Sequence, residues 1–202
     1  MAGMMDDILA PLKERKQMRF IVLTMVVYAG LLIPFKPFAI IPGFTELRPA
    51  NFVPVLFGVL FGPAAAWGSA VGNLLADVAS YLELGAAGTL SAGSVFGFIG
   101  NFLFAYVAWR VWMLFARKDM RIDPGRIGVF ALASLIASLV CAFVIGLGVF
   151  ALGAKNLGDS VFMVMIVTLN NLGPALVLGS IGLWLFYGKA KEAGWLLDRR
   201  AD

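Results

Sequence analysis

The sequence predicts an all-α integral membrane protein with six transmembrane helices and both termini in the cytoplasm. Of its 202 residues, 61% are hydrophobic and 14% are charged, and the mean hydropathy is +0.91. A soluble domain has too little interior to bury so many apolar side chains. The charged residues instead form short clusters between long apolar runs, as expected where lipid surrounds the middle of each helix. We therefore interpret residues 1–202 as a single membrane domain.

A short amphipathic helix is expected in the cytoplasmic N-terminal segment, residues 1–18. Between residues 5 and 17, Ile8, Leu9 and Leu12 alternate with charged side chains, which is typical of a helix that lies along lipid head groups. The alternative is a solvated, frayed tail. No small-residue cleavage site follows the charged segment, so we expect no cleaved signal peptide.

A six-helix bundle is expected over residues 19–187, followed by a cytoplasmic tail, residues 188–202. The expected spans cover residues 19–34, 51–61, 64–82, 95–115, 127–152 and 161–187. The second span is short for a hydrocarbon core of about 30 Å at a rise of about 1.5 Å per residue. It ends at Gly62 and Pro63. Residues 51–82 are therefore expected to cross as a hairpin whose turn faces the cytoplasm.

The distribution of lysine and arginine predicts the orientation. Of the sixteen such residues, thirteen fall on one side of the expected spans: Lys13, Arg15, Lys16, Arg19, Arg110, Arg117, Lys118, Arg121, Arg126, Lys189, Lys191, Arg199 and Arg200. The other side carries Lys36, Arg48 and Lys155. Because cytoplasmic loops are enriched in these residues, the first side is expected in the cytoplasm. The number of spans must then be even.

Several kinds of chemistry are not expected. The chain has no histidine, and its one cysteine, Cys141, lies within an apolar run. We therefore expect no metal site, no haem, no disulfide and no cofactor. No nucleotide-binding loop, nucleophile elbow or pair of membrane-embedded aspartates is present, so no catalytic residue and no enzyme activity is expected. Basic residues do not form a stripe with aromatic ones, which argues against nucleic acid.

Polar side chains within the spans are the first part of a candidate binding site, because hydrocarbon offers them no hydrogen-bond partner. Asn73 and Asp77 lie four residues apart on the third span, and Tyr81 continues the same face. Asn101 lies in the fourth span. At about 1.5 Å per residue, Asn73 and Asp77 lie about 14 and 20 Å from the cytoplasmic end.

The rest of the candidate site comes from the last span and the first outer loop. Asn170 and Asn171 lie about 17 to 18 Å from the outer end of the sixth span, at a depth where they can meet the third. Glu46, Arg48 and Asn51 are expected to cover the pocket from outside. In the alternative interpretation, the asparagines only join helices by hydrogen bonds of about 0.6 to 2 kcal/mol each, and the loop lies on the membrane surface.

Small residues form stripes that allow helices to approach closely. One stripe is Ala64, Gly68, Gly72 and Ala76, another is Ala66 and Ala70, and a third is Ala133, Ala137 and Cys141. Two interpretations remain open. The stripes pack helices within the bundle, or they form a docking face for a separate membrane subunit.

Two stretches resemble a known transporter family. They are FVPVLFGVLFGPAAAWGSAVGNLLADV, residues 52–78, and TLNNLGPALVLGSIGLWLFYG, residues 168–188. Both are similar to the substrate-binding S component of energy-coupling factor (ECF) transporters, in which a short second helix ends in a Gly-Pro turn. The length and the six spans agree along nearly the whole chain. The family's Ala-x-x-x-Ala docking motif, however, has no match in residues 20–32.

The resemblance implies a protein of the bacterial or archaeal cytoplasmic membrane that captures a vitamin or related micronutrient from outside. Its first outer loop would cover the substrate, and helices four to six would line the site. Delivery inward would involve an ECF transmembrane coupling subunit and two ATPases, with membrane lipids around the chain. The alternative is a membrane scaffold or assembly protein that transports nothing, in which the polar residues only hold helices together.

Overall fold

The computed structural model describes residues 2–41, 45–85, 90–116 and 123–196. Its helices are α1 (Ala2–Leu9), α2 (Arg15–Leu32), α3 (Phe52–Phe61), α4 (Pro63–Leu84), α5 (Ser94–Phe115), α6 (Pro124–Ala151), α7 (Leu157–Pro174) and α8 (Ser180–Glu192). Short helical turns are η1 (Ala10–Leu12), η2 (Ile33–Phe35), η3 (Pro49–Asn51) and the π-helical η5 (Ala175–Gly179). Strands β1 (Ala39–Ile41) and β2 (Thr45–Glu46) pair as an antiparallel ribbon. Apart from this small ribbon, the predicted all-α fold is confirmed.

Four segments of the described chain are long and apolar enough to cross a membrane: Arg15–Phe35, Ser94–Phe115, Pro124–Ala151 and Leu157–Glu192. Pro49–Phe61 is a shorter apolar helix. Helix α4 has the length of a span, but its small and polar residues place it outside this set. These findings support a multi-pass membrane protein. The count of six crossings stays a prediction.

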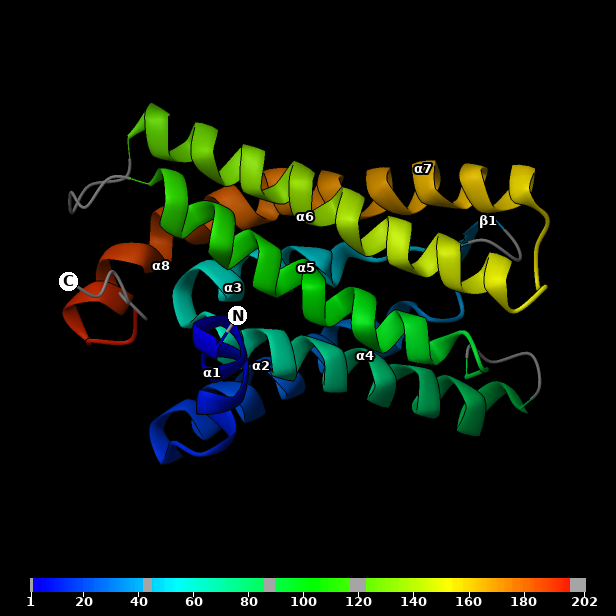
Figure 1. Ribbon diagram of the computed structural model, residues 1–202, viewed down its shortest axis with the longest axis horizontal. Coiled ribbons are helices and arrows are strands. Elements are labelled where there is room, and N and C mark those ends of the chain that lie inside the picture. The colour runs from blue at the N-terminus through cyan, green and yellow to red at the C-terminus, as the bar shows by residue number, and fades with distance from the viewer. Residues whose placement is uncertain (1, 42–44, 86–89, 117–122, 197–202) are drawn as a thin grey trace.

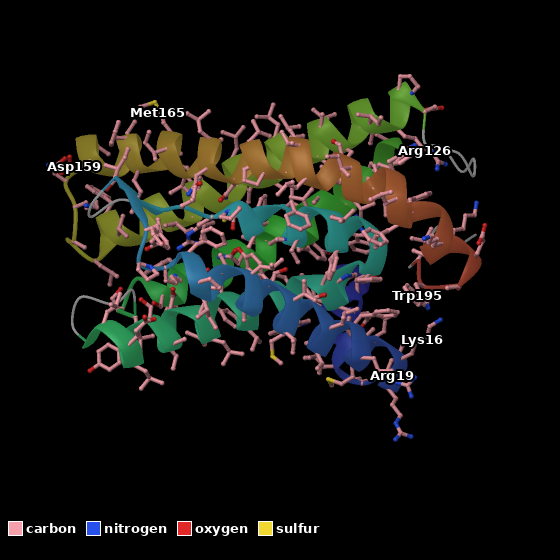
Figure 2. The ribbon with its side chains drawn as sticks, turned by 180° about the vertical axis from the view of Figure 1, so that it is seen from behind. Lys16, Arg19, Arg126, Asp159, Met165 and Trp195 are labelled. Atoms are coloured by element: carbon pink, nitrogen blue, oxygen red, sulfur yellow. The ribbon has the colours of Figure 1, made fainter. Side chains whose placement is uncertain are left out.

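The long helices run along the long axis of the molecule, and α1 and α8 lie toward the same end of it (Figure 1). The C-terminal end of α5 and the start of α6 lie there too, whereas β1 and the connection from α6 to α7 lie at the opposite end. Figure 2 places Lys16, Arg19 and Arg126 at the first end and Asp159 at the other. We call these the basic end and the ribbon end. Clustered basic residues favour the cytoplasmic side of a membrane.

The N-terminal boundaries differ from those predicted. The expected helix over residues 5–17 ends at Leu9, and Gln17 already belongs to α2. Pro11 separates the two helices, because proline lacks the backbone N–H that a continuous helix needs. Helix α1 also packs on the bundle, since the Trp67 indole donates a hydrogen bond to the Ile8 carbonyl at 2.8 Å.

The last predicted span is longer than expected. It was placed over residues 161–187, but helical structure continues from Leu157 to Glu192 through α7, η5 and α8. Pro174 lies inside this stretch, directly before the π-helical turn. A π-turn accommodates a local break in the regular hydrogen-bond ladder without ending the helix.

Helix α3 explains how a short apolar helix is stable in this fold. Val53, Val55, Leu56 and Leu60 are at most 2% exposed, so protein rather than lipid surrounds the helix. Its length therefore does not have to match the bilayer. The chain then turns at Gly62, whose φ of 61° and ψ of −139° favour glycine. Pro63 begins α4, so the predicted helical hairpin is present.

The small-residue stripes lie inside the bundle. A Cβ atom added at Gly68 would lie 2.6 Å from the Ile21 carbonyl oxygen, and one at Gly72 would lie 3.0 Å from the Met25 carbonyl oxygen, both in α2. Ala64, Ala66, Ala70, Ala76, Ala133 and Ala137 are 0% exposed, and Cys141 is 2% exposed. The stripes therefore serve packing within the chain, and the idea that they form an exposed docking face is wrong.

Candidate functional site

One buried ion pair holds the loop that carries the ribbon against the bundle, and a second, partly exposed pair lies within that loop. We call residues 36–41 and 45–51 the ribbon loop. Lys36, at its start, places its Nζ 2.5 Å from Oδ1 of Asp77 on α4, and the two side chains are 2% and 6% exposed. The Lys36 Nζ also lies 4.0 Å from Oε2 of Glu46. Because Lys36 and Asp77 are both withdrawn from water, their attraction is much stronger than that of a surface ion pair.

Arg48 forms the second pair and extends the cluster to α4. Its Nε and Nη2 donate to Oε2 of Glu46 at 3.0 and 2.9 Å. Its Nη1 donates to Oδ1 of Asn73 at 3.3 Å, and the Asn73 amide donates to Oδ2 of Asp77 at 3.4 Å. We call Lys36, Glu46, Arg48, Asn73 and Asp77 the ion cluster. It contains two basic and two acidic side chains.

The neighbouring charges determine the protonation of the loop carboxylate. Burial alone would raise the pKa of Glu46, but the adjacent Arg48 and Lys36 lower it below its ordinary value. Burial, helped by the charge of Arg48, lowers the pKa of Lys36, and the nearby Asp77 and Glu46 oppose this shift. Glu46 is therefore anionic at neutral pH and able to accept hydrogen bonds.

A second polar group lies next to the ion cluster and joins four elements. The Tyr28 hydroxyl on α2 is 2.9 Å from Oδ1 of Asn51 and 2.8 Å from Oδ1 of Asn101. Asn51 and Asn171 approach each other at 2.6 Å between Nδ2 and Oδ1. All four side chains belong to residues at most 3% exposed. We call Tyr28, Asn51, Asn101 and Asn171 the amide chain; it connects α2, η3, α5 and α7.

Gly97 on α5 connects the two groups. Its carbonyl oxygen accepts a hydrogen bond from Nδ2 of Asn101 at 2.8 Å. A Cβ atom added at Gly97 would lie 3.2 Å from Nδ2 of Asn73. The absence of a side chain here brings the α5 backbone close to the ion cluster. The two groups therefore form one continuous polar region toward the ribbon end.

Eight of the nine residues expected to form the site lie in this region. Seven are members of the two groups, and the eighth, Asn170, donates from Nδ2 to the backbone carbonyl of Glu46 at 2.8 Å. That bond attaches α7 to β2. Tyr81 differs: it lies one turn beyond Asp77 and is 47% exposed. This exposed position gives no support to the prediction that Tyr81 belongs to the binding site.

The sequence interpretation omitted Lys36 and Tyr28. Lys36 was one of only three basic residues on its side of the expected spans, and such a residue beside an apolar loop needs a counter-charge. Tyr28 lies within the first apolar span, where a buried hydroxyl needs a partner. Both signals were present, but neither identifies the partner.

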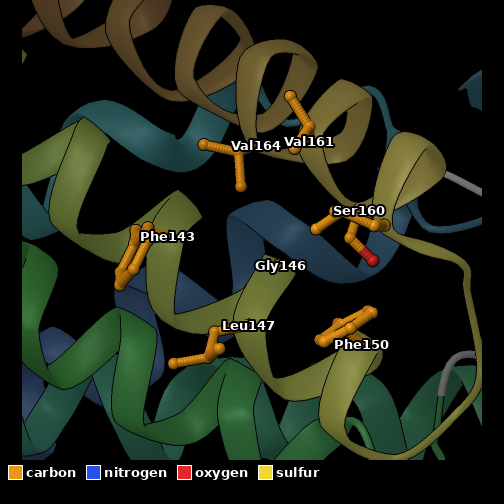
Figure 3. A pocket seen from close by; sticks show the side chains of 8 residues that line it. Phe143, Gly146, Leu147, Phe150, Ser160, Val161 and Val164 are labelled. Atoms are coloured by element: carbon orange, nitrogen blue, oxygen red, sulfur yellow. The ribbon is translucent and has the colours of Figure 1, made fainter.

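An apolar hollow of about 190 Å³ lies between α6 and α7 (Figure 3). It is lined by Phe143, Gly146, Leu147, Phe150, Leu157, Ser160, Val161 and Val164. Phe143 and Leu157 are 60% and 64% exposed, as expected for side chains that face lipid. Acyl chains suit this hollow better than a polar ligand does. Among the described residues, no group of three or more His, Cys, Asp or Glu is arranged to hold a metal ion.

Comparison with known proteins gives one family match. Residues 19–188 match the family model described as "QueT transporter". The match extends from α2 into α8 and includes every residue of the ion cluster and of the amide chain. Neither the curated proteins nor the solved structures that were compared gave a significant match.

Proposed function

Because the chain belongs to the QueT transporter family, an ECF-type S component family for uptake of queuosine precursors, we propose that it captures such a precursor at the ion cluster. Membership makes it a membrane substrate-uptake protein and not an enzyme. It also supports the resemblance found in residues 52–78 and 168–188. The proposal adds the substrate and the place where it binds.

The buried ion cluster carries this proposal. Charged groups inside a membrane protein are costly and usually mark a substrate pathway. Here Glu46, Arg48 and Lys36 belong to a loop at the ribbon end, opposite the clustered basic residues. With the basic end in the cytoplasm, the cluster lies toward the outside, where a captured nutrient arrives.

The chemistry of the cluster suits a guanine-like base. Queuosine precursors are 7-deazaguanines, whose polar edge presents N–H donors beside a carbonyl oxygen. The carboxylates of Glu46 and Asp77 accept hydrogen bonds, while Arg48 and the Asn73 amide donate them. The cluster therefore offers partners for both parts of that edge. In the structure the same groups pair with each other, so ligand binding exchanges internal bonds for ligand bonds.

The ribbon loop has to move for the ligand to enter. It is held to α4 by the Lys36–Asp77 pair and to α7 by the bond from Asn170 to the Glu46 backbone. Opening breaks these attachments and the Arg48–Asn73 bond, and closure then covers the bound ligand. Such a cover removes water from the cluster and strengthens each ligand contact.

The proposed setting is the cytoplasmic membrane of a bacterium or archaeon, with an ECF coupling subunit and two ATPases as partners. The chain itself has no nucleotide-binding motif. Since the small-residue stripes are buried, another lipid-facing surface would contact the coupling subunit. A scaffold function, the alternative, would need no ligand at all.

We expect native mass spectrometry of the protein, purified in mild detergent and mixed with queuine or 7-aminomethyl-7-deazaguanine, to show one bound base per chain. The same base at about 100 times its Kd should stabilise the fold by about 2.7 kcal/mol, measured as a higher melting temperature. Guanine, thiamine and riboflavin serve as controls. If none of the 7-deazaguanines binds or stabilises, the proposed substrate is wrong. If another compound of the panel binds instead, the substrate class changes but the capture function stands.

A further inference from the structure

The amide chain contains a conflict of hydrogen-bond donors. The Tyr28 hydroxyl has one hydrogen, yet it faces two amide oxygens, from Asn51 at 2.9 Å and from Asn101 at 2.8 Å. One of the two amides must present its NH₂ group instead. In addition, Nδ2 of Asn171 is buried and has no hydrogen-bond partner among the residues that the structure describes. An unpaired buried donor is costly, because it has given up its hydrogen bonds to water.

Asn101 fixes the direction of the whole chain. Its Nδ2 donates to the Gly97 carbonyl at 2.8 Å, so its Oδ1 faces Tyr28 and accepts the hydroxyl hydrogen. Tyr28 must then accept from Asn51, which requires a half-turn of the Asn51 amide. The oxygen and nitrogen of an amide have nearly the same shape, so this turn changes no packing.

The half-turn at Asn51 requires another at Asn171. The two amides approach at 2.6 Å, so an oxygen of Asn51 at this contact needs an NH₂ group of Asn171 opposite it. The oxygen of Asn171 then takes the place of the unpaired nitrogen. The thiol of Cys141, 2% exposed on α6, lies beside the Asn171 side chain and has one hydrogen to donate.

We propose that one ordered hydrogen-bond chain runs from the Cys141 thiol through Asn171, Asn51, Tyr28 and Asn101 to the Gly97 carbonyl, and that these side chains position the site. Each amide then donates once and accepts once. Tyr28 donates to Asn101 and accepts from Asn51. This hydrogen-bond chain joins five elements, α6, α7, η3, α2 and α5. It fixes the side chain of Asn51, which follows Arg48 by three positions in the sequence.

The direction of these hydrogen bonds has a consequence for ligand binding, and that consequence rests on the proposed function. Asn51, Asn101 and Asn171 are at most 3% exposed, whereas the Glu46 and Arg48 side chains are 17% and 20% exposed, so the ligand contacts the ion cluster and not the amide chain. Tyr28 and Cys141 act through the amides as positioning residues. The ordered chain itself is a property of the protein without ligand.

Infrared spectroscopy of the S–H stretch tests the order, because Cys141 is the only cysteine in the sequence. Its band is identified by its loss in Cys141→Ala. We expect the wild-type band at lower frequency than that of an alkanethiol in hydrocarbon, since the thiol donates a hydrogen bond. Asn171→Leu should return the band to the free value, whereas the neighbouring Asn170→Leu should leave it unchanged. A wild-type band at the free-thiol position would overturn the proposal, even if Asn171→Leu does not fold.

Two further outcomes separate this inference from the proposed function. Saturation with a bound 7-deazaguanine should leave the S–H band in place. A shift on binding would mean that the ligand reaches the amide chain, which overturns the positioning role but leaves substrate capture intact. If no base binds, the proposed function fails, while the band of the ligand-free protein still tests the order.

Tyr28→Phe should broaden the S–H band of Cys141, because the Asn51 and Asn171 amides lose the hydroxyl group that fixes their direction.

Discussion

Replacing Lys36 by methionine is expected to lower the free energy of unfolding by about 3–5 kcal/mol. The substitution keeps the length of the side chain but leaves the Asp77 carboxylate without the ammonium group that lies 2.5 Å away. Asp77 stays in a site where its side chain is 6% exposed, so water does not replace the lost partner. A reversible unfolding titration with sodium dodecyl sulfate measures the effect.

The double substitution Lys36→Met and Asp77→Leu is the informative companion. A buried ion pair replaced by apolar groups of similar size is often nearly neutral. We therefore expect the double variant to recover most of the stability that the single variant loses, while it fails to bind a 7-deazaguanine. Equal losses from Lys36→Met and from the double variant would show that the pair is not the origin of the effect.

Replacing Gly68 by leucine is expected to cost about 3 kcal/mol or more, because it forces α2 and α4 apart. A first added carbon would already lie 2.5 Å from Cβ of Thr24 and 2.6 Å from the Ile21 carbonyl oxygen. A carbonyl oxygen belongs to the backbone and cannot turn aside as a side chain does. The melting temperature in detergent and the yield of folded protein measure the result.

Gly30→Leu is the matched control for this change. Gly30 lies on α2, the helix that Gly68 contacts, but a Cβ atom added there meets nothing within 4 Å in the described part of the chain. The same leucine should therefore change stability by less than about 0.5 kcal/mol, as expected at a surface position. Similar losses at Gly68 and Gly30 would contradict the close packing of α2 on α4.

The long helices were predictable because lipid-facing helices need continuous apolar sequence. The fourth span was predicted over residues 95–115, and α5 covers Ser94–Phe115. Helix ends were less accurate where the structure depends on one proline or on a local irregularity. Pro11 separates α1 from α2, and the π-helical turn after Pro174 lets the last helix continue to Glu192.

The candidate site was predictable in part, because polar residues in apolar runs need partners. Asn73 and Asp77 share a helix face through their spacing alone. The pairing of Lys36 with Asp77 joins residues 41 positions apart, and that of Asn51 with Asn171 joins residues 120 positions apart. Helix periodicity cannot predict such contacts, since they depend on how the helices pack.

The small-residue stripes show the same limit. Gly68 and Gly72 indicate that a helix can approach closely, but not whether that helix belongs to the same chain. The structure gives the answer, since α2 occupies this face of α4. A stripe therefore predicts a contact between helices without naming the partner.

The most direct test of the ligand site is a calorimetric titration of the wild-type protein, Glu46→Gln and Glu83→Gln with the same 7-deazaguanine. Both substitutions remove one negative charge, but Glu46 lies in the ion cluster while Glu83 is exposed near the end of α4. We predict that Glu46→Gln raises the Kd at least tenfold, about 1.4 kcal/mol, and that Glu83→Gln leaves it unchanged. Melting temperatures confirm that each variant is folded. An unchanged Kd for folded Glu46→Gln, or equal losses for both variants, would contradict ligand binding at the ion cluster.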